Sequence, residues 1–171
     1  CFVVKIVNDR DKSYFEEVGG KLFTNISNLK NINTIDMFAD TLVKKSNTST
    51  KSFAEFIFGF NLKSYTFNKY KTLNKNKLNK KIIVKKITLN KNKKEKDYKY
   101  FNAIKEGVFL ARDLVSEPPN VLNPKTYAQE IKKLTKYGLK IKSYGEAELK
   151  KLGLNALLGV GQGSSNESYL V

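Results

Sequence analysis

Two adjacent prolines, Pro118 and Pro119, constrain this chain more than any other feature of its sequence. Neither can donate a helical hydrogen bond, so a helix that approaches them from the N-terminal side must end there. The preceding segment, Asp97–Glu117, has apolar residues spaced alternately three and four apart, which places them on one helical face. These residues are Phe101, Ile104, Val108, Ala111 and Val115. We therefore predict one long helix over Asp97–Glu117, packed along its whole length, and a domain boundary at the proline pair.

The segments before that helix alternate between the hydrophobic periods of helices and strands. Helices are predicted over Tyr14–Ile26 and Ser52–Lys63. Their apolar faces consist of Phe15, Val18, Leu22 and Ile26 in the first and Phe53, Phe56, Ile57 and Phe60 in the second. Strands are predicted over Phe2–Val7, Asn33–Phe38 and Lys81–Leu89. This alternation predicts an α/β domain over residues 1–117, with the long helix 97–117 as its last element.

A second α/β unit is predicted to begin after the prolines, over residues 118–171. Asn123 and Pro124 are typical of an N-cap and a first helical position, and Gly138 should end that helix after Tyr137. Its predicted apolar face consists of Tyr127, Ile131 and Leu134. Leu139–Ser143 reads as a strand, and Glu146–Leu152 as a short helix that ends at Gly153. About 53 residues are too few for an independent core, so we expect this domain to be incomplete.

Both ends of the chain lie in strand-like sequence. It opens at Cys1, without Met, and stops at Tyr169–Val171. An unpaired strand end invites aggregation, so natural termini seldom lie inside a core strand. We therefore expect an internal fragment of a longer protein, cut at both ends. No targeting signature is visible at the start.

The composition excludes several kinds of chemistry. Histidine is absent, which excludes His-based triads, His general bases and His-ligated zinc from these residues. The single cysteine, Cys1, excludes internal disulfides and suits a reducing compartment. The longest apolar runs are about five residues, whereas a membrane span needs about 20, so a membrane protein is not expected. Carboxylates, lysines or hydroxyls would have to carry any catalysis.

The net charge of +16 comes from 30 lysines and only two arginines, Arg10 and Arg112. Thirteen lysines and one acid, Glu95, lie between Lys63 and Lys96. A solvated lysine-rich surface is the favoured interpretation, and a phosphate-binding patch is the alternative. Over residues 63–71 aromatic residues alternate with lysines, as in base-stacking surfaces, but no arginine is present to stack on a base. The residues of this candidate nucleic-acid patch are Lys63, Lys69, Lys71, Lys75, Lys77, Lys80 and Lys81.

No motif in the chain forms an active site. Residues 9–11 lack the glycine and glutamate of a calcium loop and favour a turn that caps a helix. The stretch Gly159–Ser165 fits neither phosphate-binding glycine motif, so a tight turn that lets two segments approach is expected. Ser164 and Ser165 have no histidine to activate them. Glu117 is interpreted as a residue that caps a helix or pairs across a domain interface, and Arg112 and Asp113 as interface residues that hold the hinge.

Three stretches, in order, resemble the leucyl aminopeptidase (cytosol aminopeptidase) family of dinuclear metallopeptidases. They are Gly59–Thr72 (GFNLKSYTFNKYKT), Gly107–Ala128 (GVFLARDLVSEPPNVLNPKTYA) and Glu148–Val171 (ELKKLGLNALLGVGQGSSNESYLV). The likeness covers Phe53–Val171 well and Phe2–Phe38 loosely. Ser116 departs from the asparagine usual in the family, which is a conservative exchange.

The resemblance implies an N-terminal α/β domain related to macro domains, a long connecting helix and the start of a catalytic α/β domain. It implies a cytoplasmic homo-hexamer that removes N-terminal residues, preferably leucine and other apolar ones, from peptides. Two divalent metal ions, manganese or zinc, would share the attacking water in the parent protein. Their ligands and the catalytic residues of the family lie beyond the Gly-Gln-Gly-Ser segment, so no catalytic or metal-binding residue is expected in this chain, which should bind no metal and be inactive alone.

Two other functions stay open at this point. Some members of the family bind DNA, and the basic run Lys63–Lys96 motivates a weak nucleic-acid-binding role for the N-terminal domain. The third hypothesis is a scaffold protein that kept the fold and lost the metal ligands.

Overall fold

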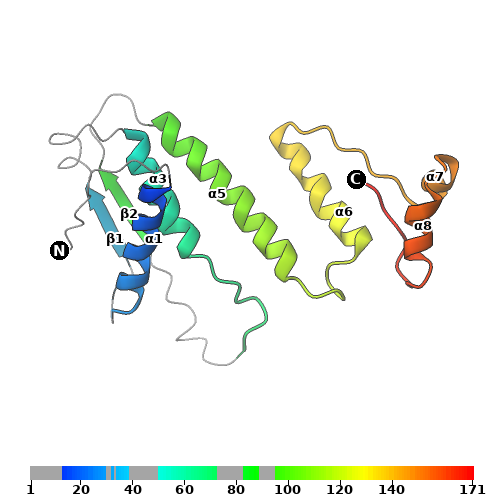
Figure 1. Ribbon diagram of the computed structural model, residues 1–171, viewed down its shortest axis with the longest axis horizontal. Helices are drawn as coiled ribbons and strands as arrows, with labels where there is room; N and C mark the ends of the chain where they lie inside the picture. The colour runs from blue at the N-terminus through cyan, green and yellow to red at the C-terminus, as the bar shows by residue number, and fades with distance from the viewer. Residues whose placement is uncertain (1–12, 30–31, 33, 39–49, 73–82, 89–94) are drawn as a thin grey trace. The chain divides into compact units, whose positions relative to one another are not determined.

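The computed structural model describes residues 13–29, 32, 34–38, 50–72, 83–88 and 95–171 (Figure 1). Within them the chain divides into two compact units, Cys1–Ala111 and Arg112–Val171, which we call unit 1 and unit 2. The predicted boundary at the proline pair lies inside unit 2 and stays a prediction. The predicted strand Phe2–Val7, the turn at residues 9–11 and Cys1 lie outside the described residues.

Among its described residues, unit 1 contains a parallel two-stranded sheet and three helices. In chain order these are α1 (Tyr14–Ser27), β1 (Thr34–Phe38), α3 (Thr50–Lys63), β2 (Ile83–Thr88) and the part of α5 (Glu95–Ser116) up to Ala111. Thr34 lies opposite Ile83, and the register shifts between Ile35 and Asp36. A parallel pair needs a crossover connection, and α3 lies within that connection. The α/β architecture predicted for this region is confirmed.

Helices α1 and α3 pack against each other closely, as Figure 1 shows. Gly19 and Gly59 lie at the crossing, where a Cβ on Gly19 would overlap the backbone of Phe56 and one on Gly59 that of Glu16. Such an approach of two backbones requires glycine, because any side chain would separate the helices. Glycine thus sets the distance at which the two apolar helix faces meet.

The core of unit 1 contains the apolar residues that recur at helical spacing in α1 and α3. Phe60 has no exposed surface, and its ring packs edge-to-face on Phe23 with centroids 5.2 Å apart. The buried members of the cluster are Ile26, Met37, Phe53, Phe56, Ile57 and Phe60. Phe15, Val18 and Leu22 of α1 pack against it and are partly buried. The predicted apolar faces of both helices are therefore confirmed.

Helix α5 joins this core through aromatic contacts. Tyr98 packs against the cluster, Phe101 lies 5.3 Å from Phe58, and Phe109 lies 5.1 Å from Tyr65. The predicted helix is confirmed, but its predicted packing along the whole length is wrong. Ala111 is exposed and Val115 is 87% exposed, because neither side chain has enough neighbours to cover it.

Unit 2 begins with the end of α5 and continues through four short helical segments. They are α6 (Pro124–Lys132), the 3₁₀ helix η1 (Lys133–Tyr137), α7 (Glu146–Lys151) and α8 (Asn155–Gly161). The predicted helix from Pro124 to Tyr137 is confirmed in its bounds, although its last five residues are 3₁₀ rather than α. Gly138 and Gly153 end their helices with φ of 84° and 71°, the left-handed conformation expected of glycine there.

Two predictions for unit 2 are wrong. Leu139–Ser143 is not a strand, because a strand needs a hydrogen-bonded partner and the described residues supply a single bridge, between Tyr144 and Leu170. The expected tight turn over Gly159–Ser165 is partly helical, since α8 extends to Gly161. The close approach expected there is confirmed, because a Cβ on Gly161 would collide with the Ser168 side chain.

Candidate functional site

A metal centre is the first site to test, since acidic side chains are the remaining ligands in a chain without histidine. Within the described ranges, no group of three or more His, Cys, Asp or Glu side chains could hold a metal ion. The described residues therefore do not fit a dinuclear metal centre, and no catalytic step through metal ions can be derived from them. Among the same residues, no helix combines the length and apolar character needed to cross a bilayer.

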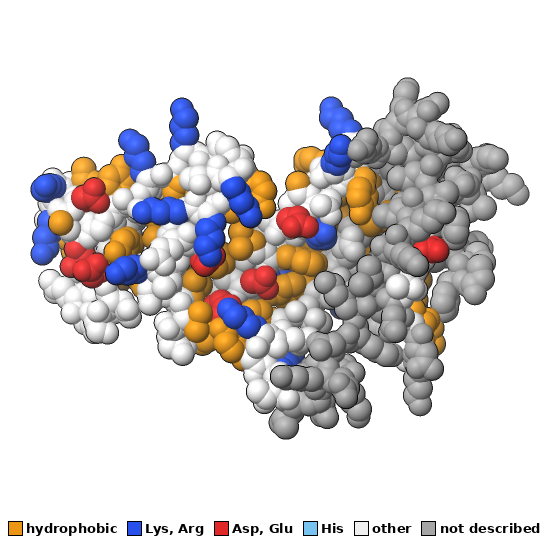
Figure 2. All heavy atoms as spheres, turned by 180° about the vertical axis from the view of Figure 1, so that it is seen from behind, with side chains coloured by type: hydrophobic (Ala, Val, Ile, Leu, Met, Phe, Trp, Pro, Cys, Tyr) orange, Lys and Arg blue, Asp and Glu red, His pale blue; other side chains and the backbone are white. Residues whose placement is uncertain are grey.

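The candidate nucleic-acid patch is described only in part. Lys63, Lys69 and Lys71 are exposed, whereas Lys75, Lys77, Lys80 and Lys81 lie outside the described residues. The Lys69 ammonium group lies 5.5 Å from the centroid of the Tyr70 ring, and Tyr70 is 48% exposed. On the face drawn in Figure 2, lysine and arginine side chains are spread over the described parts rather than gathered in one area.

The aromatic residues between these lysines are divided between packing and exposure. Tyr65 packs against Phe109 of α5 and is half-buried, so its ring contributes to the fold of unit 1. Phe67 lies 5.8 Å from Tyr70, which leaves Tyr70 as the exposed ring of the three. A surface that stacks successive bases needs several accessible rings. The described part of the patch therefore offers lysine charge and one accessible tyrosine.

The interface residues inferred from the sequence lie where α5 ends. Arg112 and Asp113 are exposed residues of this helix, and Glu117 follows its last turn with its backbone N–H directed to Leu114 at 3.4 Å. Their pairing across an interface stays a prediction.

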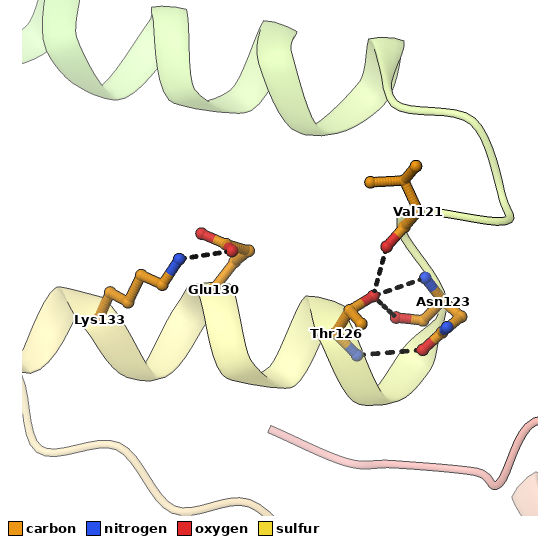
Figure 3. Close-up of polar contacts among 5 residues, drawn as sticks. All are labelled: Val121, Asn123, Thr126, Glu130 and Lys133. Atoms are coloured by element: carbon orange, nitrogen blue, oxygen red, sulfur yellow. Dashed lines mark hydrogen bonds and ion pairs between the residues drawn. The ribbon is translucent and has the colours of Figure 1, made fainter.

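The N-terminus of α6 is held by a set of short-range hydrogen bonds (Figure 3). The Asn123 side-chain oxygen accepts from the Thr126 backbone N–H at 3.0 Å, and the Thr126 hydroxyl accepts from the Asn123 backbone N–H at 2.8 Å. The same hydroxyl donates to the Val121 carbonyl at 2.9 Å. This reciprocal cap explains why the chain turns into a helix directly after the prolines. All these partners are local, so the arrangement is structural.

The segment that follows α8 is tied to α7 through Ser168. Gly161 lies against Ser168, which is 8% exposed, and the Ser168 backbone N–H donates to the Glu146 carboxylate at 3.1 Å. A glycine is needed at position 161 for this approach. Ser164 was expected to lack an activating base. Its hydroxyl accepts from the Asn166 N–H at 3.0 Å in a local turn.

Unit 2 also contains a groove that the sequence did not reveal. Its volume is about 740 Å³, and it is open to solvent. The lining residues are Thr135, Leu139, Lys140, Ile141, Lys142, Tyr144, Leu170 and Val171. The alternation of apolar residues and lysines over Leu139–Lys142 predicted a strand, and in the structure this segment lines the groove without being one.

Comparison with known proteins shows which family the sequence is similar to. Residues 109–171 match the model of the cytosol aminopeptidase family, catalytic domain. A probable cytosol aminopeptidase of Agrobacterium fabrum is 46% identical over 125 residues, which is 71% of this chain and 25% of the relative. One of Phytoplasma mali is 39% identical over 150 residues, which is 85% of this chain and 30% of the relative. The chain thus spans a quarter to a third of the length of these relatives.

Two solved structures have the same fold over almost the whole chain. A mutant of tomato leucine aminopeptidase has a TM-score of 0.75 at 21% identity, covering 94% of this chain and 32% of its own. The bottromycin maturation enzyme BotP, in complex with Mn, has a TM-score of 0.71 at 22% identity and covers 92% and 32%. At these identities the likeness concerns the fold.

Proposed function

We propose that this chain, which belongs to the cytosol aminopeptidase family, is part of a metal-dependent aminopeptidase that releases N-terminal residues, preferably leucine and other apolar ones, from peptides. The observation that carries the proposal is the match of residues 109–171 to the catalytic domain of the family. In this proposal unit 1 is the N-terminal α/β domain, and unit 2 holds the first elements of the catalytic domain.

The metal-binding and catalytic residues are assigned to the part of the relatives that this chain does not cover, about 70–75% of their length. Two divalent ions, manganese or zinc, would polarise the peptide carbonyl and supply a hydroxide at neutral pH. Support for manganese comes from BotP, which was solved in complex with Mn.

An assay of aminopeptidase activity tests the proposal. Leucine p-nitroanilide is incubated with the 171-residue chain and with the longer product of the same gene, each with manganese, with zinc or with EDTA. We expect metal-dependent release of p-nitroaniline from the longer product alone. Metal-dependent release by the 171-residue chain would contradict the assignment of the catalytic residues. A longer product inactive with every divalent ion would favour the scaffold hypothesis.

Assembly and location follow from the same family membership. We propose a homo-hexamer in the cytoplasm, built largely through the catalytic domain, so the 171-residue chain alone should be monomeric or poorly soluble. Size-exclusion chromatography of both proteins tests this, and a monodisperse hexamer of the 171-residue chain would contradict it.

A second candidate function, weak nucleic-acid binding by unit 1, is supported by the exposed side chains of Lys63, Lys69 and Lys71 and by the exposed ring of Tyr70, over which the Lys69 ammonium group lies. Binding of a DNA duplex is measured from low to physiological salt, with a triple variant of these lysines to glutamine. If the patch binds DNA, the variant loses affinity and its salt dependence becomes shallower. As a matched control, Lys125, Lys132 and Lys136 of unit 2 are changed to glutamine. An equal loss in both variants would reveal unspecific attraction by a chain of charge +16.

A further inference from the structure

The positive charge of unit 2 is concentrated in one stretch, residues 125–142. This stretch has six lysines and one acidic residue, Glu130, whereas residues 143–171 have two lysines and three acidic residues. Residues 132–142 alone contain five lysines and no acidic residue. An even spread of lysine along the chain would not produce this asymmetry within one unit.

The lysines of this stretch lie on neighbouring segments. Thr135 of η1 lines the same groove as Lys140 and Lys142, so η1 and the residues after Gly138 lie side by side. Four lysines from the end of α6, from η1 and from the segment that follows are exposed. They are Lys132, Lys136, Lys140 and Lys142. A surface of this kind attracts a partner that carries a series of negative charges.

An exposed aromatic ring lies among these lysines. Tyr137 is 68% exposed, compared with 48% for Tyr70 in unit 1. The Lys136 ammonium group lies over its ring, 4.8 Å from the centroid. A lysine beside an accessible ring suits a ligand with a flat base and a phosphate, because the base stacks on the ring and the phosphate binds the ammonium group.

The ring favours one kind of polyanion over others. An acidic peptide would use the lysines alone, since its carboxylate side chains do not stack on a ring. In duplex DNA the bases are stacked on one another, so their faces are not accessible to Tyr137. An unpaired strand offers both phosphates and open base faces.

We propose that an exposed surface of unit 2 binds single-stranded nucleic acid. This surface, called the Tyr137 surface below, is formed by Lys132, Lys136, Tyr137, Lys140 and Lys142. A base stacks on Tyr137, and the four lysines contact phosphates. Four phosphate contacts to a single strand give a slope of log K against log salt concentration of about −3. The surface is distinct from the candidate patch of unit 1.

The role of the ring is tested by fluorescence anisotropy with the longer product of the same gene and a short fluorescein-labelled oligothymidylate. Tyr137→Leu should weaken binding about tenfold, because one stacked base is lost. Tyr137→Phe keeps the ring and should stay within about twofold of the unchanged protein. Binding of a duplex of the same length should respond to neither substitution. Equal affinity of the Tyr137→Leu variant and the unchanged protein for the oligothymidylate would overturn the proposal.

The role of the lysines is tested by the salt dependence of the same binding. Lys136→Gln with Lys140→Gln should make the slope shallower by about 1.4, since two phosphate contacts are lost. Lys150→Gln with Lys151→Gln in α7 removes the same charge from the same unit and should leave the slope unchanged. Equal effects of the two double variants would mean general attraction by a positively charged chain and would overturn the proposal.

The fifth lysine of residues 132–142 gives a test of opposite sign. The Lys133 ammonium group lies 2.6 Å from the Glu130 carboxylate, which neutralises its charge (Figure 3). Glu130→Gln releases Lys133 for a further phosphate contact, so binding should become tighter and the slope steeper by about 0.7. Unchanged or weaker binding by this variant would overturn the proposal.

Two further outcomes identify alternatives. If polyglutamate displaces the oligothymidylate at equal charge concentration and binds the Tyr137→Leu variant as well as the unchanged protein, the partner is an acidic protein and the proposal is overturned. Binding by the 171-residue chain alone would also overturn it, because the rest of the longer protein would then cover the Tyr137 surface. The inference goes beyond the proposed function, since a longer protein that binds the oligothymidylate without aminopeptidase activity contradicts the proposed function alone.

Discussion

The two units of this chain differ in how well they cover their own apolar residues. Unit 1 buries a contiguous cluster around Phe60. In unit 2, all of which the structure describes, the buried residues are Ala128, Leu149 and Ser168. Its exposed large hydrophobic residues are Val115, Val121, Tyr127, Tyr137, Leu139, Leu152, Leu154, Val160, Leu170 and Val171.

The difference follows from the lengths and contacts of the helices. In unit 1, α1 and α3 have 14 residues each and meet along whole faces at two glycines. In unit 2, the helices after the prolines have five to nine residues, which is too short to bury a continuous stripe. The helices of unit 2 therefore form, although many of their apolar side chains stay exposed to solvent. Unit 2 leaves at its surface apolar side chains that its own helices do not cover.

The largest expected effect is a difference in local stability within the 171-residue chain. Amides of α3 near Phe60 should exchange roughly a thousandfold more slowly than those of α7 near Leu149, because opening free energy follows the buried apolar area around an amide. Hydrogen exchange measures both. In the longer protein we expect the difference to shrink. Equal protection in the 171-residue chain would refute the contrast between the units.

The next largest effect is expected from removing the buried Phe60 ring, which tests the difference in burial between the two units. Phe60→Ala should lower the free energy of unfolding of unit 1 by about 3–5 kcal/mol, because the cavity is fully enclosed. Val160→Ala in unit 2 is the control, and its effect should stay within about 0.5 kcal/mol because Val160 is 87% exposed. Urea denaturation followed by circular dichroism measures both. Similar losses in the two variants would show that Val160 is covered in solution.

A glycine-to-alanine substitution should change the stability of unit 1 in opposite directions at the contact between α1 and α3 and in α5. Gly59→Ala should destabilise unit 1 by about 1–3 kcal/mol, since the new Cβ meets the backbone of Glu16. Gly107→Ala in α5 has no atom within 4 Å of its Cβ and should stabilise the helix by about 0.5–1 kcal/mol. Thermal unfolding of the two variants gives the signs. A stabilised Gly59→Ala variant would mean that α1 and α3 lie further apart.

The cap of α6 should contribute a moderate amount to unit 2. Asn123→Ala removes the acceptor of the Thr126 N–H and should cost about 1 kcal/mol. Asn123→Asp keeps an acceptor at the same place and should retain most of the stability. The measurement is hydrogen exchange of the first turn of α6. Equal effects of the two substitutions would exclude the side-chain cap as the cause.

The smallest expected effect is a pH dependence in unit 1. Burial raises the pKa of the Glu55 carboxyl, Glu16 and Asp97 raise it further, and Lys51 lowers it. Because the folded-state pKa lies above the unfolded one, the native state binds more protons between the two values. The free energy of unfolding should therefore fall as the pH rises from the ordinary glutamate pKa through the raised one. Glu55→Gln should remove this slope in urea titrations across that range, and an unchanged slope would assign it to another group.

Much of the local structure could be predicted from single segments. The i, i+3, i+4, i+7 spacing of Phe53–Phe60 identified both α3 and its buried face, which is confirmed. Asn123, Pro124 and Gly138 identified the ends of α6 and η1 because caps depend on a few neighbouring residues. Helix α8 was missed, since its sequence Asn155–Gly161 contains two glycines, which suggest a turn more than a helix.

The candidate site was less accessible to sequence reasoning. The lysines of the proposed patch could be counted, but the inward packing of Tyr65 on Phe109 depends on a helix 44 residues away in the chain. The groove depends on the bridge between Tyr144 and Leu170, whose partners are 26 residues apart. A pattern within a single segment does not predict contacts between residues so far apart in the chain.

The sequence by itself determined where most of the described helices begin and end, which faces are apolar, and the family to which the chain belongs. These properties depend on spacing, caps and residue identity over a few turns. Only the tertiary structure decided which apolar faces are covered. The face of α3 is buried, whereas Val115 and Leu139 are exposed, because burial requires a second surface at the right distance, and an isolated hydrophobic period does not specify one.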